Sequence, residues 1–209
     1  MTGRRLLLIA LGATMASGCG YNTIQSLDER AAGAQGQIET QLQRRADLIP
    51  NLVATVKGYA QHEEKVFSDI ANARAGLLSS VRSGDPEQMA NANAQFGGAL
   101  GRLLVLTENY PNLKADQSFR DLQTQLEGTE NRIATARTDY NTAVREYNEY
   151  IRKFPAAMTA KVTGAKPRKY FTATAGSETP PTVDFGRPAA PSGGAPAPGA
   201  GAGGATKTP

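Results

Sequence analysis

The sequence is poor in the side chains from which proteins build disulfides and metal sites. It has one cysteine and one histidine among 209 residues. A single cysteine cannot form an intramolecular disulfide or a cysteine-based metal site. A di-iron or di-manganese bundle needs a Glu-x-x-His pair from each of two helices, but the only histidine, His62, has Tyr59 three residues before it. We therefore expect no bound metal and no cofactor.

A long apolar run is also missing. The apolar run near the N terminus covers residues 6–16, which is shorter than the roughly 20 residues that cross a bilayer as a helix. Arg4 and Arg5 stand before this run, and the small residues 16–18 follow it, directly before Cys19. This order predicts a signal peptide over residues 1–18.

The residues around Cys19 resemble a lipobox, at which the chain is cleaved and the cysteine thiol receives a diacylglyceryl group. One position departs from the pattern, because Ala16 stands where leucine is usual. We expect Cys19 to be lipidated, and two or three acyl chains would then attach the protein permanently to a membrane. Two alternatives stay open: an ordinary cleaved signal peptide, and an uncleaved anchor that reaches about Tyr21.

The expected location is the cell membrane or the outer membrane, with the domain facing the periplasm or the cell exterior. Gly20, and not aspartate, follows the cysteine. This resembles an outer-membrane sorting signal in a bacterium with two membranes. The choice between inner and outer membrane stays open.

Apolar residues recur every three or four positions from residue 21 to residue 154, which is the period of an amphipathic helix. The pattern predicts an all-α fold, an antiparallel up-and-down bundle of long helices in three to four segments, over residues 19–155. Residues 156–185 carry a short aromatic patch at Tyr170 and Phe171 and are expected to form an extended arm that docks on the bundle. Residues 186–209 are rich in Pro, Ala and Gly and are expected to be a disordered tail.

Pro50 interrupts the first long helical pattern, because proline removes a helical hydrogen bond and disfavours helix at the residue before it. Either a kinked helix or a tight reversal would satisfy the sequence. The next boundary is clearer: Gly84 can end a helix, Asp85 can cap the next one and Pro86 suits its first position. We expect the last helix to cover residues 116–154, with Pro155 as its stop.

Polar residues on the helix stripes are the candidate site. Arg45 and Glu63 fall on the face that carries the apolar residues of the first long segment, where an unpaired charge would cost several kcal/mol. We therefore expect a structural polar network that ties this segment to the last helix, or a surface that binds a partner. The candidate residues are Arg45, Asn51, Glu63, Glu130, Asn131 and Tyr140.

The remaining charges favour neither nucleic-acid binding nor catalysis. The formal net charge of +4 arises from 23 basic and 19 acidic residues, and no groove-reading motif accompanies them. Glu127 and Glu130 could be imagined as an acid–base pair, but glutamate is a common surface residue on helices, where it forms salt bridges with basic residues three or four positions away. We expect no catalytic residue and no nucleic-acid partner.

Several stretches in order resemble the LemA family of bacterial envelope proteins. They are residues 44–63 (RRADLIPNLVATVKGYAQHE), 103–113 (LLVLTENYPNL) and 126–133 (LEGTENRI), followed by Tyr140-Asn141, Tyr147-Asn148 and Phe154-Pro155. The resemblance covers about residues 21–185. It implies a membrane anchor and a four-helix bundle that faces away from the cytoplasm, and it favours a chain reversal at Pro50, whereas the unbroken apolar period favours a kink.

These observations predict a non-enzymatic, membrane-tethered scaffold or interaction protein of the bacterial envelope, with a role in membrane organisation as some family members imply. Its partners would be the membrane, through the N-terminal lipid anchor, and envelope proteins that the sequence does not identify. An alternative is an accessory module that binds an envelope protease or transporter. A hydrolase that uses only carboxylates is a third and weaker interpretation.

Overall fold

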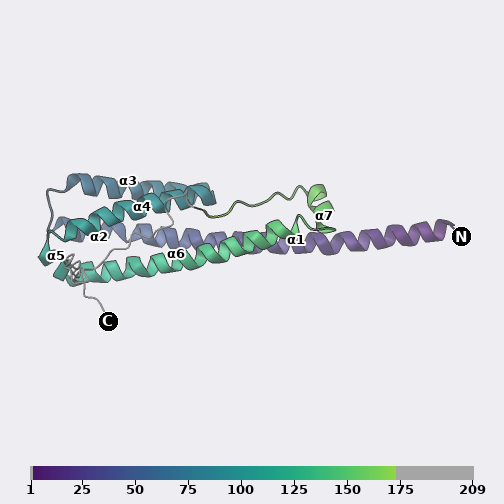
Figure 1. Cartoon of the computed structure of the whole chain (residues 1–209), viewed down its shortest axis with the longest axis horizontal. Coiled ribbons are helices and arrows are strands. Elements are labelled where there is room, and N and C mark those ends of the chain that lie inside the picture. Colours follow the sequence, from purple (N-terminus) through teal and green to yellow (C-terminus); the bar gives the residue numbers. More distant parts are fainter. Residues whose placement is uncertain (1, 173–209) are drawn as a thin grey trace, which may run out of the picture. The chain divides into compact units, whose positions relative to one another are not determined.

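The computed structural model describes residues 2–172, with side chains from Gly20 onward (Figure 1). Its regular structure is helical, and no strand occurs in this part of the chain. The side chain of Cys19, the arm beyond residue 172 and the tail at 186–209 lie outside the described residues. The helices are α1 (Thr2–Asp47), α2 (Ile49–Lys57), α3 (Glu64–Ser83), α4 (Pro86–Thr107), α5 (Pro111–Ala115), α6 (Gln117–Tyr150) and α7 (Ala156–Thr163).

Two antiparallel helix pairs make up the bundle. Helix α1 packs along α6, α3 packs along α4, and α1 also contacts α3. The chain passes along the bundle through α1 and α2, returns through α3, passes again through α4 and returns through α6 (Figure 1). The predicted all-α, antiparallel up-and-down bundle is therefore confirmed.

The core consists of the apolar positions that the helical period selects. Burial of such side chains stabilises the fold by about 25 cal/mol for each Å² of apolar surface removed from water. Fully buried examples from α1 to α4 are Ile38, Leu42, Leu52, Ile70, Leu77, Met89, Phe96 and Leu103.

Pro50 bends the first segment without reversing it. Helix α1 ends at Asp47, α2 begins at Ile49, and the Leu52 amide bonds to the Leu48 carbonyl, so the chain continues in the same direction. Because proline has no amide hydrogen, the carbonyl four residues before it, that of Ala46, loses its helical donor. Arg74 Nε of α3 donates to this oxygen at 2.9 Å. The kink is thus stabilised by a neighbouring helix.

The reversal lies after α2, in residues 58–63, where the sequence pattern indicated continuous helix. Tyr59, expected on the core stripe, is 41% exposed, and Ala60 is buried in its place. Glu63, expected on the same stripe as Arg45, is the residue before α3 and is only partly buried. The apolar spacing continues through this turn, so periodicity alone could not reveal it; Gly58, the residue at which α2 ends, is its one local signal.

The boundary between α3 and α4 follows the sequence prediction. Gly84 has a φ of 67° and ends α3 in the left-handed conformation. The Asp85 carboxylate accepts the amides of Glu87 at 2.9 Å and Gln88 at 3.3 Å, and Pro86 is the first residue of α4. This two-residue connection makes α3 and α4 antiparallel.

The C-terminal end of the described chain differs from the prediction in two ways. Helix α6 ends at Tyr150, before Phe154, because the ring of Pro155 would clash with the Ile151 carbonyl in a continued helix. The expectation of an extended arm is wrong for Ala156–Thr163, an alanine-containing segment that forms α7 and stops at Gly164 in the left-handed conformation. Residues 165–172 have no regular secondary structure and follow the bundle as a stretched-out segment (Figure 1); we call them the strap.

The strap and α7 cover the part of the α1–α6 pair that the other helices cannot reach. Helix α6 has 34 residues, whereas α3 has 20 and α4 has 22. At 1.5 Å per residue α6 is therefore roughly 20 Å longer than α3. A separate apolar cluster of Ile24, Tyr147, Ile151 and Ala160 forms in this part of the bundle.

Candidate functional site

Arg45 joins three helices in the middle of the bundle. Its Nη1 donates to Asn93 Oδ1 of α4 at 2.7 Å and forms an ion pair with Glu130 Oε2 of α6. Its guanidinium also lies over the Phe96 ring, 5.0 Å from the centroid. We call these four residues the Arg45 cluster. It connects the first segment with α6, and it also includes α4.

The Arg45 side chain is 6% exposed, whereas the Glu130 side chain is 51% exposed. Burial lowers the pKa of Arg45 from its usual value, and the Glu130 carboxylate opposes this shift. Arginine nevertheless stays protonated, because a guanidinium is not deprotonated in proteins. Arg45 Nε is buried with no hydrogen-bond partner among the described residues. The cluster is therefore a buried cation with an incomplete set of partners.

The strap is held by two asparagines of α6 that bind its main chain. Asn148 donates to the Arg168 carbonyl at 2.9 Å and accepts the Arg168 amide at 2.8 Å. Asn141 does the same with Phe171, at 3.2 Å and 2.9 Å. Each side-chain amide thus pairs with both polar groups of one strap residue.

The spacing of these pairs follows from the two backbone geometries. Asn141 and Asn148 are seven residues apart on a helix, a separation of about 10.5 Å at 1.5 Å per residue. Arg168 and Phe171 are three residues apart on an extended chain, which covers about 10 Å at 3.3 Å per residue. The two rises match, so both asparagines reach the strap at once.

Tyr140 completes the clamp. It is 1% exposed, and its hydroxyl donates to the Lys169 carbonyl at 2.8 Å. Burial raises the pKa of Tyr140, so the phenol stays protonated and able to donate at neutral pH. We call Tyr140, Asn141 and Asn148 the strap clamp. Phe171, which is buried, packs into the main core beside it.

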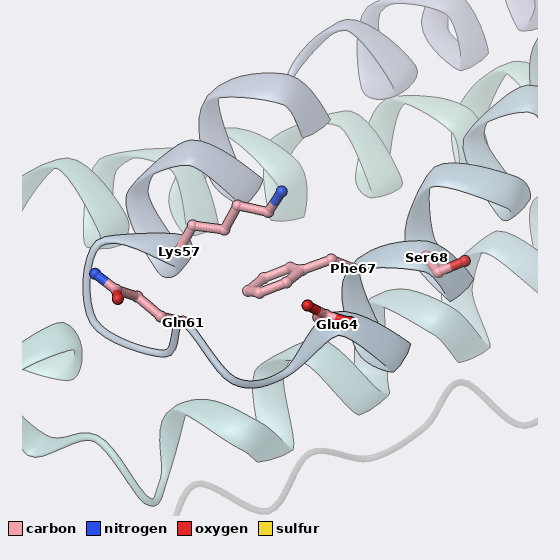
Figure 2. A pocket seen from close by; sticks show the side chains of 5 residues that line it. All are labelled: Lys57, Gln61, Glu64, Phe67 and Ser68. Carbon is pink, nitrogen blue, oxygen red and sulfur yellow. The ribbon is translucent and has the colours of Figure 1, made fainter.

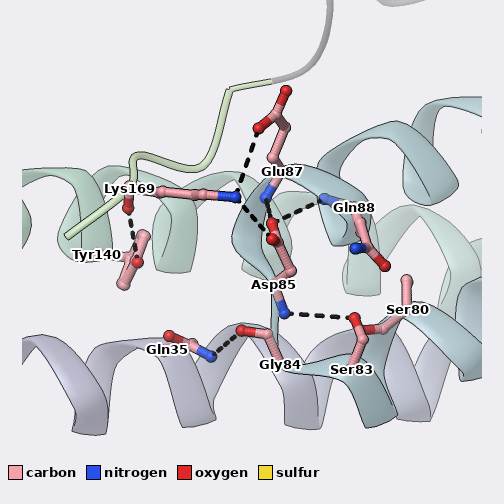
Figure 3. Close-up of polar contacts among 9 residues, drawn as sticks. All are labelled: Gln35, Ser80, Ser83, Gly84, Asp85, Glu87, Gln88, Tyr140 and Lys169. Atoms are coloured by element: carbon pink, nitrogen blue, oxygen red, sulfur yellow. Dashed lines mark hydrogen bonds and ion pairs between the residues drawn. The ribbon is translucent and has the colours of Figure 1, made fainter.

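Ion pairs fasten the strap to two further helices. Arg168 Nε bonds to Asp28 Oδ1 of α1 at 2.6 Å. Lys169 Nζ bonds to Asp85 Oδ2 at 2.8 Å, at the turn between α3 and α4, as Figure 3 shows. The bond to Lys169 is the main cause that lowers the pKa of Asp85, and the bond to Asp85 is the main cause that raises the pKa of Lys169. The strap therefore contacts three separate parts of the bundle.

The other candidate residues lie apart from these two junctions. Asn51 is exposed on α2. Glu63 accepts a long bond of 3.5 Å from the Tyr110 hydroxyl at the opposite end of the bundle from α7. Asn131 is exposed on α6 and lines a shallow groove between α1 and α6. The structure therefore does not bring the six candidates into one network.

Many contacts of the Arg45 cluster and of the strap are made by residues that the sequence analysis did not select as site candidates. They are Asp28, Asp85, Asn93, Asn141, Asn148, Arg168 and Lys169. One signal was available for the clamp, because Tyr140-Asn141 recurs as Tyr147-Asn148 seven residues later. No local signal marked the strap side of these contacts.

Two of the depressions on the described surface are shallow and open. Figure 2 shows the first, beside the turn between α2 and α3, where Lys57 Nζ lies 5.2 Å from the centroid of the Phe67 ring. The second is the α1–α6 groove, near which the Gln41 side-chain oxygen is buried without a hydrogen-bond partner among the described residues. Ser68, Lys57 and Glu64 all line the first depression, but the Ser68 hydroxyl points away from Glu64 (Figure 2) and forms no hydrogen bond to either residue. This depression therefore lacks the paired nucleophile and base of a hydrolytic site.

Within the part of the chain that the structure describes, no group of His, Cys, Asp or Glu side chains is placed to hold a metal ion. In the same part, no helix has a stretch long and apolar enough to cross a membrane.

Fold and junctions together define an all-α bundle whose packing is fixed by a buried arginine and by a main-chain clamp. The chain belongs to the LemA family, whose model matches residues 34–185. It is 31% identical to magnetosome protein MamQ 2 of Paramagnetospirillum magneticum over 77% of this chain and 67% of the relative. It is 27% identical to magnetosome protein MamQ of Magnetospirillum gryphiswaldense over the same shares. The resemblance seen in the sequence motifs is thereby confirmed.

Proposed function

We propose that the protein is a non-enzymatic, membrane-tethered helical bundle that binds or organises other components of the bacterial envelope. Membership of the LemA family supports attachment to a membrane. The relatives named as magnetosome proteins are in keeping with such attachment. The lipid on Cys19 is the proposed tether.

The observation that carries this proposal is the continuity of α1. Cleavage before Cys19 would leave this helix unbroken from Cys19 to Asp47, so one element contains both the proposed lipidation site and the first core residues. Ile24, the first of these, is 1% exposed and lies five residues after Cys19, about 7.5 Å along a helix. A tether at Cys19 would therefore hold the bundle close to the membrane and with little freedom to rotate.

The position of the carboxylates supports a role without catalysis. Glu130 is engaged by Arg45, and Glu127 is exposed and accepts a bond from Gln123 at 3.3 Å. Neither carboxylate lies in a pocket that excludes water, which is the usual means of raising a carboxyl pKa for acid–base catalysis.

The tether is tested by labelling cells with a clickable fatty acid and fractionating their membranes. We expect wild-type protein to carry the label and to sediment with membranes, and Cys19→Ala to lose both properties. Ser79→Ala, at an exposed position of α3, serves as the matched control and should behave as wild type. If wild-type protein carried no label and Cys19→Ala still sedimented with membranes, the lipid tether would be wrong. The anchor would then be the uncleaved apolar segment.

The scaffold role is tested by photo-crosslinking in cells. A crosslinking amino acid at Val105, which is 64% exposed on α4, should trap a defined envelope component. The same residue at Leu103, which is buried on that helix, should trap none. The contrary result has two parts. Exposed positions on all helices would trap nothing, and purified protein would turn over a substrate in a reaction that Glu127→Gln abolishes. The non-enzymatic role would then be wrong.

A further inference from the structure

Helix α7 has an unusual distribution of side chains. Its small residues face the bundle: Ala156 and Ala160 are 3% and 5% exposed. Its large apolar residues face away: Met158 is 64% exposed and Val162 is 88% exposed. These two are four residues apart and therefore lie on the same side of the helix. An amphipathic helix of a soluble domain normally has the opposite arrangement.

Phe154, in the turn before α7, adds a third large apolar side chain and is 82% exposed. Single exposed apolar residues are ordinary on protein surfaces, whereas a group of them indicates a binding surface. We call Phe154, Met158 and Val162 the α7 patch.

All the charged residues in the chain segment around this patch are basic. Residues 151–172 contain lysine and arginine but no aspartate or glutamate. Three of these cations have ion-pair partners: Lys153 with Glu149, and Arg168 and Lys169 through the strap. The others are Arg152, Lys161 and Lys166, which are exposed and form no ion pair among the described residues. Apolar and cationic side chains are thus presented together.

Helix α7 also lies at the N-terminal end of the described side chains. A Cβ atom placed on Gly20 would be 3.3 Å from Thr159 Oγ1, so α1 and α7 are in contact at the residue that follows Cys19. Figure 1 shows α7 beside α1, at the end of the α1–α6 pair away from α2. A tether at Cys19 would bring α7 to the membrane.

We propose that α7 and the turn before it form a second membrane contact, in which the α7 patch enters the boundary between headgroups and acyl chains and Arg152, Lys161 and Lys166 meet anionic lipid phosphates. The inference rests on the proposed membrane tether. An apolar surface fringed by lysine and arginine is the composition that binds in this interface, and basic residues near an anionic leaflet add electrostatic attraction. A protein partner would not require this excess of unpaired cations.

The absence of tryptophan from the sequence permits a direct test. Full-length protein with its own anchor is purified as Val162→Trp and reconstituted in vesicles of phosphatidylcholine with phosphatidylglycerol. Val105→Trp, on a similarly exposed valine of α4, is the matched control. Emission of Val162→Trp should shift to shorter wavelength and be quenched by brominated acyl chains, and that of Val105→Trp should not. Adding Lys161→Glu and Lys166→Glu should weaken the quenching.

The possible failures differ from one another. Protein that does not float with the vesicles would overturn both the tether and the α7 contact. Floating protein with unquenched emission at both positions would overturn the α7 contact alone. A shift at Val162→Trp without quenching would mean that protein, such as a second copy, covers the patch. Equal quenching at both positions would mean that the whole bundle lies on the lipid. Either result would also overturn the inference.

Discussion

The Arg45 cluster and the strap clamp both join segments that are far apart in the sequence, but they do so by different chemistry. The Arg45 cluster places one cation in the core, where Asn93, Phe96 and Glu130 surround it. The strap clamp uses three neutral side chains, and each of them bonds to the main chain of the strap.

The difference concerns what each junction can tolerate. Burying a cation is expensive, and replacing a buried charge and its partner with apolar side chains often leaves a protein as stable or more so. Main-chain pairing by asparagine costs little desolvation, and it places no demand on the side chains of the strap. The Arg45 cluster should therefore be sensitive to loss of a partner, whereas the strap should detach locally without loss of the bundle.

The largest effect is expected for Arg45→Ala. It removes the cation and leaves a cavity beside Phe96, and we expect a loss of about 2–4 kcal/mol in the free energy of unfolding. Arg45→Met, which fills the space without charge, should be as stable as wild type or more stable. Urea denaturation followed by circular dichroism measures both. Equal stability of all three proteins would show that the cluster contributes nothing to folding.

The next effect sharpens the contrast with the strap. In Asn148→Asp and Asn141→Asp the donated amide hydrogen is lost and a carboxylate faces a carbonyl oxygen. Each variant should lose hydrogen-exchange protection at residues 168–171, while global stability falls by at most about 1–3 kcal/mol.

Asn131→Asp is the control for this pair, because Asn131 is exposed on the same helix. Its strap should remain as protected as that of wild type. If strap and bundle lost protection together in Asn148→Asp, the strap would be part of one cooperative unit and the proposed contrast would fail.

A smaller effect is expected for Tyr140→Phe. The ring stays packed and only the hydroxyl that donates to Lys169 is removed, which should cost about 1 kcal/mol. Tyr147→Phe is the matched control, since Tyr147 is also buried and its hydroxyl forms no hydrogen bond within the described residues. Calorimetry measures the melting temperature of both variants. An equal decrease in the two would show that the Tyr140 hydrogen bond does not stabilise the fold.

The smallest effect is the pH dependence of the Asp85–Lys169 ion pair. The pKa of Asp85 is lowered by folding, so this contribution is present above the unfolded value of about 3.9 and is lost as pH falls through the folded pKa. The pKa of Lys169 is raised, so its contribution is present below about 10.4 and is lost as pH rises through the folded pKa.

NMR shifts of the strap amides should therefore stay constant between these limits and change outside them. Lys169→Gln is the suitable comparison, because Asp85 also caps α4 and cannot be replaced without disturbing that helix. If the strap chemical shifts changed at acid pH in Lys169→Gln as they do in wild type, the change would arise from carboxylates other than Asp85.

Much of the bundle could be predicted because helical periodicity is a local property. The stripe positions Leu42, Leu52, Ile70 and Phe96 are all buried, and the Gly84-Asp85-Pro86 boundary is formed by residues adjacent in the chain. Arg45 was a good candidate for the same reason, since a charge on an apolar stripe needs a partner. Tyr59 and Glu63 were misplaced because the turn after α2 leaves the apolar period intact.

The sequence by itself determined most of the helical residues, most of the core faces and the family, since these depend on short-range spacing and on motifs read in order. Only the tertiary structure decided that Pro50 makes a kink, because the carbonyl that it frees is satisfied by Arg74 from another helix. Only the tertiary structure placed the strap on Asn141 and Asn148. The paired residues are 20 and 30 positions apart in the sequence, and the pairing requires the rise of an extended chain to match the rise of a helix. Contacts of this kind depend on lengths and directions in space, which residue spacing does not contain.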